Sequence, residues 1–184
     1  MDALEVICGN VYGVYVRSDM YNGRGIPKLE ATEIDVRYEG VAGDNTVSRI
    51  EKYNGGRMDG EKYLDRAVLI WTDDKLKEMN DEGWPAMPGD LGENIMISGV
   101  NYEMLEIGQE YQIGGAILMI SRVCPPCYQL HELIPVWNER DETLNFSVDK
   151  GPEVVKTLAG RRGYYARVIE EGVVRKGEGV ILLS

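Results

Sequence analysis

Cysteine, histidine and positive charge are all scarce in this chain. Its 184 residues include three cysteines and one histidine, and 20 basic residues stand against 31 acidic ones, which gives a net charge of −11. An odd cysteine count is unlike the disulfide framework of small secreted proteins. An acidic chain also lacks the basic face that general nucleic-acid binding requires, although local arginines can still bind a small anion.

Long apolar runs are also missing, and no targeting signal is expected. No run approaches the roughly 20 residues that span a bilayer. Asp2 and Glu5 occupy positions where a signal peptide carries lysine or arginine. We therefore expect a cytoplasmic protein that contacts neither nucleic acid nor membrane.

Glycine is abundant, with 22 residues, and apolar residues recur in short alternating segments. Many short strands with few helices predict a mainly β, barrel-like fold of mixed or antiparallel strands with a few short helices, and an open sandwich is the competing layout. With 43% hydrophobic residues, residues 1–184 can form a single domain with a proper core. Strands are expected at 6–16 (with bulges or bends at Gly9 and Gly13), 34–38, 67–71, 94–97, 111–113, 116–123, 164–169, 173–175 and 180–183, and a long loop at 40–62.

Two helices have clear start and stop signals. Thr72 is expected to cap a helix that ends at Gly83, and a second helix should run from Pro152 to Gly160. Near the C-terminus, Tyr164 and Tyr165 alternate on a predicted strand. One of them should face the core and the other solvent or a cleft.

The segment Cys124-Pro125-Pro126-Cys127 closes the strong apolar run 116–123. Proline favours extended geometry here, and three polyproline-like steps separate the two cysteine Cα atoms by about 9 Å. A disulfide needs about 7 Å or less, so a local bridge is disfavoured unless Pro126 is cis and forms a tight turn. The flanking sequence also lacks the strand–helix–strand frame of a thioredoxin-type motif.

Cys127 is the main candidate for chemistry. Cys127, Leu130, Leu133 and Ile134 recur at helical spacing, which predicts a short helix with Pro126 at its first position. Unpaired amides and the helix dipole in the first turn would favour a thiolate, the form that attacks sulfur or binds a soft metal. The alternative is a small buried apolar residue, which free cysteine often is.

Several motifs, taken in order, resemble the MOSC domain, the C-terminal domain of molybdenum cofactor sulfurases. The resemblance covers residues 5–183, and its order and spacing are more specific than any one motif. The matching segments are Gly40-Val-Ala-Gly43-Asp44, Arg66-Ala-Val-Leu69, Pro88-Gly-Asp-Leu-Gly92-Glu93-Asn94-Ile95, Leu105-Glu-Ile-Gly108, Pro126-Cys127 and Arg162-Gly163-Tyr164-Tyr165-Ala166-Arg167-Val168.

The resemblance implies a β-barrel-like fold and one important cysteine, which maps onto Cys127. In relatives this cysteine ligates the molybdenum of the molybdopterin cofactor, or the domain receives activated sulfur and passes it on. No pyridoxal-phosphate site is expected in this chain, so sulfur would come from a partner, a cysteine desulfurase or sulfurase, and go to a molybdoenzyme. The family often has histidine after the Gly-Asp pair, but Asn45 stands there, which puts a proton-transfer or ligand role at that position in doubt.

Other residues are candidates to bind the cofactor. The planar guanidinium of arginine suits a pterin phosphate. The alternative is that the candidate arginines are ordinary surface charges. Glu93 and Asn94 could contact ligand from the end of a loop, although their main role is expected to be structural. Asp44 could orient a neighbouring group or simply close a turn. The candidate arginines are Arg122, Arg161, Arg162 and Arg167.

The sequence therefore predicts a protein that binds molybdenum cofactor or carries sulfur through Cys127, as a sulfur-transfer enzyme or a cofactor-dependent reductase. One alternative is a non-enzymatic binding or adaptor barrel with structural cysteines. Another is a zinc-stabilised domain that uses Cys8, Cys124, Cys127 and His131, although structural zinc commonly uses two clearly paired knuckles.

Overall fold

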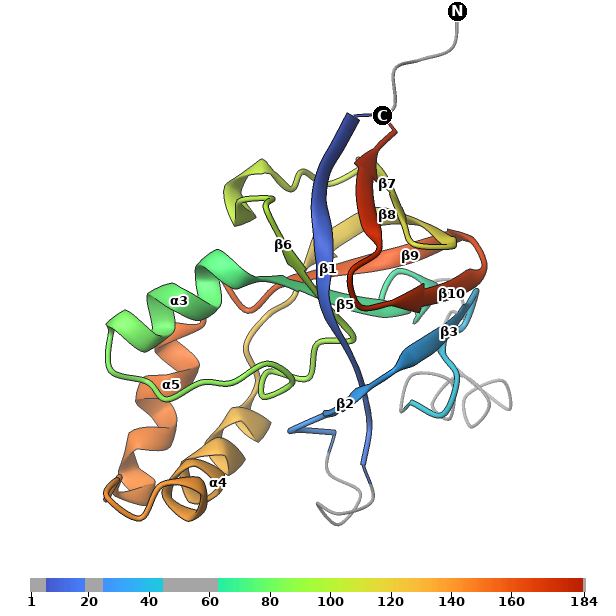
Figure 1. Cartoon of the computed structure of the whole chain (residues 1–184). Coiled ribbons are helices and arrows are strands. Elements are labelled where there is room, and N and C mark those ends of the chain that lie inside the picture. The colour runs from blue at the N-terminus through green and yellow to red at the C-terminus, as the bar shows by residue number, and fades with distance from the viewer. Residues whose placement is uncertain (1–5, 19–24, 45–62, 184) are drawn as a thin grey trace, which may run out of the picture.

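The computed structural model describes residues 6–18, 25–44 and 63–183. Strands dominate this part of the chain, and the predicted mainly β fold is confirmed (Figure 1). The strands are β1 (Val6–Val16), β2 (Leu29–Ala31), β3 (Glu33–Arg37), β4 (Gly40–Val41), β5 (Val68–Thr72), β6 (Ile95–Ser98), β7 (Glu110–Ile113), β8 (Ala116–Val123), β9 (Tyr164–Glu170), β10 (Gly172–Arg175) and β11 (Gly179–Leu182).

Seven of the described strands close into a barrel. Their order is β1-β11-β7-β8-β9-β5-β6, and β6 returns to β1. Every pair in the ring is antiparallel except β5 and β6, which are parallel. β1 closes the ring because it is long enough to pair with both neighbours and with β2, and its register shifts next to Gly9 and Gly13, as predicted. Closure leaves no free sheet edge within the ring.

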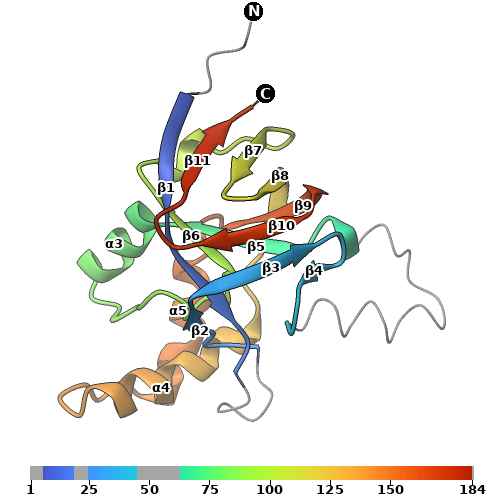
Figure 2. The same ribbon diagram turned by 45° about the vertical axis from the view of Figure 1, so that its right-hand side comes forward.

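A smaller sheet of order β10-β3-β4 packs beside the barrel (Figure 2). Ile34 and Val36 of β3 are buried and alternate with polar residues, as predicted. Tyr38 lies beyond the end of β3 and is exposed, so the strand begins and ends one residue earlier than the predicted 34–38. Most of the predicted loop 40–62 lies outside the described residues.

Helices gather on one side of the barrel in both views (Figures 1 and 2). In the described ranges, no helix is long and apolar enough to cross a membrane. The α-helices are α3 (Asp73–Asp81), α4 (Leu133–Arg140) and α5 (Gly151–Thr157), and the 3₁₀ helices are η2 (Tyr102–Met104), η3 (Tyr128–Glu132) and η4 (Val148–Lys150).

The apolar residues form two cores on either side of the barrel wall. The first fills the barrel and includes Val68 and Ile70 of β5. The second lies between the barrel and the helices and includes Trp71 from the same strand, with Met79 and Trp137 from α3 and α4. β5 is thus buried on both faces, which explains why its sequence is a continuous apolar run instead of an alternating one.

A buried carboxylate fixes helix α4 to the turn-rich segment before β6. Asp90 accepts two hydrogen bonds from the guanidinium of Arg140, at 2.7 and 2.9 Å, and one from Trp137 Nε1 at 2.7 Å. The backbone N–H of Met87 also donates to Asp90 at 2.9 Å. A buried carboxylate needs such partners, and this set of bonds holds the segment that precedes Glu93 and Asn94 against α4.

The hydroxyl of Thr72, at the start of α3, is buried without a hydrogen bond among the described residues. Thr72 occupies the N-cap of α3, but its side chain makes no cap hydrogen bond, contrary to expectation. Replacing Thr72 by valine should therefore raise the free energy of unfolding by about 1 kcal/mol, because a buried hydroxyl without a partner is unfavourable. Urea unfolding would measure the change.

Thr143→Val is the matched control, since the Thr143 hydroxyl donates to Asp141 at 2.6 Å and should give no gain. A loss of stability in Thr72→Val would mean that Oγ1 has a hydrogen-bond partner, and would contradict the prediction.

Candidate functional site

Arg162 is the centre of the candidate site. It lies just before β9, and only 7% of its surface is exposed. One terminal nitrogen donates to Cys127 Sγ at 3.2 Å and to the carbonyl of Pro125 at 3.0 Å, and the other donates to the carbonyl of Leu91 at 3.2 Å. Its Nε is buried without a partner among the described residues. The guanidinium therefore joins the cysteine segment to the loop before β6.

The backbone around Arg162 explains how the cysteine segment reaches it. The N–H of Cys124 donates to the carbonyl of Gly163 at 2.8 Å, which holds the end of β8 against the start of β9. Gly163 has φ +119°, and a Cβ there would lie 2.6 Å from the carbonyl oxygen of Ile70. Glycine is therefore required for the close approach of this turn to β5.

The predicted helix that begins at Pro126 is wrong. Cys127 has extended backbone angles, φ −131° and ψ 165°, and forms the N-cap of the 3₁₀ helix η3, which begins only at Tyr128. The α-helix α4 follows from Leu133. The two prolines carry no N–H and hold an extended path, so the helical spacing of the apolar residues belongs to η3 and α4. Cys127 consequently does not sit in a helical first turn, and Arg162 is its charged neighbour instead.

The two cysteines of the segment have different environments. Cys124 is fully buried, and burial raises the pKa of its thiol. Cys127 is only partly buried, and its Sγ also lies 3.8 Å from Oε1 of Gln129. Both thiols are free, with no disulfide between them. Of the pair, Cys127 is the one with both solvent access and a cation in contact.

The charge of Arg162 depends on these neighbours. Burial opposes the charged form, but the neighbouring Cys124 and Cys127 thiols and the Tyr165 hydroxyl outweigh it and raise the pKa of Arg162 above its ordinary value. No carboxylate pairs with this guanidinium in the described ranges, and its contacts are carbonyls and sulfur. An anion beside it would be strongly favoured.

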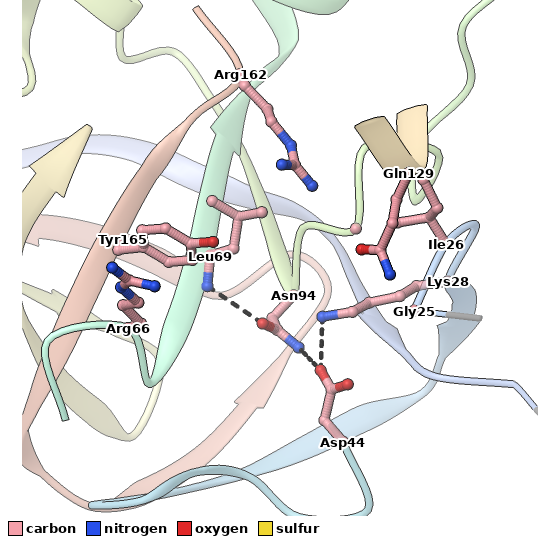
Figure 3. A pocket seen from close by; sticks show the side chains of 11 residues that line it. Gly25, Ile26, Lys28, Asp44, Arg66, Leu69, Asn94, Gln129, Arg162 and Tyr165 are labelled. Carbon is pink, nitrogen blue, oxygen red and sulfur yellow. Dashed lines mark hydrogen bonds and ion pairs between the residues drawn. The ribbon is translucent and has the colours of Figure 1, made fainter. Parts of the chain in front are cut away.

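A cavity of about 100 Å³ adjoins Arg162 (Figure 3). Cys127 is not a lining residue, but its Sγ contacts two residues that are, Arg162 and Gln129. Tyr165 lines the cavity, whereas Tyr164 packs against the cores, so the predicted alternation is confirmed. Most lining side chains are polar or charged: Lys28, Asp44, Arg66, Asn94, Gln129, Arg162 and Tyr165.

Lys28, Asp44 and Asn94 form a buried network at one end of this cavity. Lys28 Nζ lies 2.5 Å from Asp44 Oδ2, and Asn94 Nδ2 donates to the same oxygen at 2.5 Å. Asn94 also accepts from the N–H of Leu69 at 3.2 Å, so it links β5 to the network. Burial lowers the pKa of Lys28, and Asp44 opposes that effect. Asn94 and Asp44 therefore connect β5 to Lys28, and both also line the cavity.

Glu93 lies next to this network but does not line the cavity. It is fully buried, and its Oε1 accepts from the N–H of Gly89 at 2.5 Å. Its Oε2 has no partner within the described chain, and no arginine pairs with it there. Burial raises the pKa of Glu93 to about 7.

The other predicted arginines lie away from the cavity. Arg122 is exposed near the end of β8. Arg167 of β9 pairs with Asp65 at 2.8 Å, and Arg161 pairs with Glu82 of the α3 C-cap at 2.6 Å. None of the three lines the cavity around Arg162, so a cofactor-binding role for Arg122 and Arg167 stays a prediction. Asn45 lies outside the described residues.

The four residues of the zinc alternative do not come together. Cys8 Sγ donates to the carbonyl of Val180 at 3.2 Å, across the β1–β11 seam of the barrel. His131 is exposed and packs against Gly151. Across the described ranges, no group of three or more His, Cys, Asp and Glu side chains is placed to hold a metal ion. The zinc set of Cys8, Cys124, Cys127 and His131 is therefore wrong as a cluster.

Three lining residues were missed as site candidates in the sequence. Lys28 follows Pro27 in a segment with no motif, and a buried lysine is rare enough that composition argues against it. Gln129 gives no signal of its own. Arg66 belongs to a MOSC-like motif, and only that resemblance could have identified it; in the structure it lies over the ring of Tyr165 at 5.9 Å.

These features define a small mixed barrel with a thiol and an arginine beside a cationic cavity. The chain belongs to the MOSC domain family, whose model matches residues 42–181. This family is associated with the molybdenum cofactor. The predicted family resemblance is confirmed.

Solved structures of similar proteins share the fold. The YuaD protein from Bacillus subtilis aligns with a TM-score of 0.72 at 20% identity, over 95% of this chain and 94% of that one. YiiM from Geobacillus stearothermophilus aligns with a TM-score of 0.64 at 20% identity, over 96% of this chain and 75% of that one. In sequence, the uncharacterized protein YflK of Bacillus subtilis (strain 168) is 29% identical over 94 residues, which span 51% of this chain and only 37% of YflK.

Proposed function

We propose that this MOSC protein carries sulfur on Cys127 for the molybdenum cofactor. The main support is the environment of Arg162. Its buried guanidinium donates to Cys127 Sγ at 3.2 Å and has no carboxylate partner in the described residues. A buried charge without a counter-charge is costly, so a thiolate at Cys127 would compensate Arg162. The thiolate is the nucleophile in sulfur transfer.

The transfer needs a partner as sulfur donor, either a cysteine desulfurase or a sulfurase. The Cys127 thiolate attacks the outer sulfur of the donor's persulfide. The donor's S–S bond breaks, its electron pair stays on the donor thiolate, and Cys127 becomes the persulfide. A molybdoenzyme or its cofactor is the acceptor. The partly exposed position of Cys127 supports access by such partners.

Tight binding of the molybdenum cofactor itself is a second candidate, supported by the chemistry of the residues present. A thiolate is a soft metal ligand, and arginines suit an anionic phosphate. Cys127 would ligate the metal, while Arg66 and Arg162 would hold the phosphate. When bound, the cofactor supplies the redox chemistry. Protein purified from cells that make the cofactor should then contain molybdenum and pterin, and finding neither would exclude this candidate.

The carrier proposal predicts a persulfide on one residue. After incubation with a cysteine desulfurase and L-cysteine, intact mass spectrometry should show an adduct of about 32 Da, one added sulfur atom. The adduct should disappear in Cys127→Ser and remain in Cys124→Ser, because Cys124 is fully buried. Circular dichroism of both variants would check that they fold.

Two outcomes oppose this proposal. If the wild-type protein gains no sulfur, Cys127 is not a carrier, and the alternative of an adaptor barrel with structural cysteines is favoured. If Cys127→Ser keeps the adduct, the sulfur resides elsewhere. Cys8 is the third thiol and serves as an internal reference, because its Sγ donates to the carbonyl of Val180 across the β1–β11 pair, whereas Arg162 contacts Cys127.

A further inference from the structure

The cavity beside Cys127 has more positive than negative groups. Its lining includes three basic side chains, Lys28, Arg66 and Arg162, and one carboxylate, Asp44. Asp44 is paired with Lys28 at 2.5 Å. Neither Arg66 nor Arg162 pairs with a carboxylate among the described residues, and Nε of Arg162 is buried without a partner. The two guanidinium groups therefore leave an excess of positive charge on this small cavity.

The size of the cavity restricts what that charge can bind. Its volume of about 100 Å³ is well below the roughly 300–1,000 Å³ of sites that enclose drug-sized ligands. A small oxyanion fits such a space, whereas a nucleotide or a peptide does not. In Figure 3, the guanidinium of Arg162 and the amide of Gln129 extend toward the same hollow from different elements. These are the two residues that Cys127 Sγ contacts.

We propose that thiosulfate, a small divalent oxyanion that contains a transferable sulfur atom, binds in this cavity and supplies sulfur directly to Cys127. This inference rests on the carrier role proposed above and names its donor. Arg66 and Arg162 bind the sulfonate oxygens, for which the planar guanidinium is well suited. The outer sulfur of thiosulfate then lies toward Cys127, whose Sγ contacts the lining residues Arg162 and Gln129.

The transfer is balanced without an added oxidant or reductant. The Cys127 thiolate attacks the outer sulfur of thiosulfate, and a new S–S bond forms. The S–S bond of thiosulfate breaks, and its electron pair leaves with sulfite. The products are the Cys127 persulfide and one sulfite per sulfur atom transferred. The positive charge of Arg66 and Arg162 offsets the repulsion between the thiolate and the dianion.

The test is incubation of the reduced full-length protein with thiosulfate alone. We expect one sulfite released for each adduct of about 32 Da on Cys127, and neither product with Cys127→Ser. Sulfate, which has the same charge and shape but no transferable sulfur, should compete with thiosulfate. Arg66→Gln should raise the half-saturating thiosulfate concentration by about tenfold, because a hydrogen bond to a charged group is lost.

Arg37→Gln is the matched control, because Arg37 is an exposed arginine of β3 that pairs with Asp35 outside the cavity. It should leave the thiosulfate dependence unchanged. If a desulfurase loads Cys127 but thiosulfate does not, the donor proposal is overturned and the carrier role stands. If neither donor loads Cys127, both are overturned. An equal effect of Arg66→Gln and Arg37→Gln would overturn binding in this cavity.

Discussion

Replacing Arg162 by leucine is expected to slow alkylation of Cys127 at pH 7 by about tenfold. The N–H of Arg162 reaches Cys127 Sγ at 3.2 Å, and a hydrogen bond to a charged group contributes about 1.5–3 kcal/mol. Because 1.4 kcal/mol is a factor of ten in a rate or equilibrium constant, loss of the bond should slow reaction at Cys127 Sγ by about that factor. Iodoacetamide labelling followed by peptide mass spectrometry would measure the rate at Cys127.

Arg161→Leu is the control for this prediction. Arg161 is the preceding residue, but its guanidinium pairs with Glu82 at 2.6 Å, so its loss should not change the labelling of Cys127. Arg162→Leu also removes donors from the carbonyls of Leu91 and Pro125, and urea unfolding must show that the variant is still folded at 25 °C. A folded Arg162→Leu variant that labels as fast as the wild type would remove the basis of the carrier proposal.

Much of the fold could be predicted from local patterns. The strand Ala116–Val123 was predicted at its observed bounds because a mainly apolar run covers it and the Cys124-Pro125 segment ends it. Gly9 and Gly13 marked the irregular positions of β1. Local patterns alone left a barrel and an open sandwich as alternatives, because the β1–β11 pair that closes the barrel joins residues such as Val6 and Leu182 from opposite ends of the chain. Local periodicity contains no information about such contacts.

The candidate site was only partly predictable for the same reason. Cys127 was identified because cysteine is scarce in the chain and because two prolines precede it. The MOSC resemblance identified Arg162 as a candidate. The contact between them depends on the pairing of β8 with β9, which the sequence does not specify. The predicted helix start at Pro126 was wrong because the spacing of apolar residues indicates which face of a helix is buried more reliably than it indicates where the helix begins. Lys28 was missed because its burial depends on Asp44, a partner set by tertiary structure.

A pH-dependent gain in stability is expected for Glu93→Gln. Burial raises the pKa of Glu93 from 4.5 to about 7 in the folded protein. The folded state therefore holds this proton more tightly than the unfolded chain does. The stability that the proton contributes is fully present below pH 4.5 and is lost as the pH rises through about 7. The shift of 7 − 4.5 = 2.5 units, at 1.36 kcal/mol per unit, corresponds to about 3 kcal/mol.

Glutamine stays neutral, so the variant avoids this loss. It can also keep the hydrogen bond that Oε1 accepts from Gly89. Relative to the wild type, Glu93→Gln should therefore gain about 3 kcal/mol in free energy of unfolding between pH 4.5 and pH 8. Urea unfolding at several pH values would measure the difference. Glu139→Gln, on the exposed surface of α4, is the control and should show no such trend.

The charge of Glu93 also bears on the cavity. Glu93 interacts electrostatically with Lys28, which lines the cavity. Below about pH 7 the Glu93 carboxyl is protonated and leaves the positive charge of Lys28, Arg66 and Arg162 offset by Asp44 alone. Above that pH its negative charge reduces the excess, so wild-type affinity for sulfate, the non-reactive analogue, should fall as the pH rises from 6 to 8, and Glu93→Gln should fall less. Parallel pH profiles for the two proteins would show that Glu93 stays ionised, or stays protonated, throughout this range.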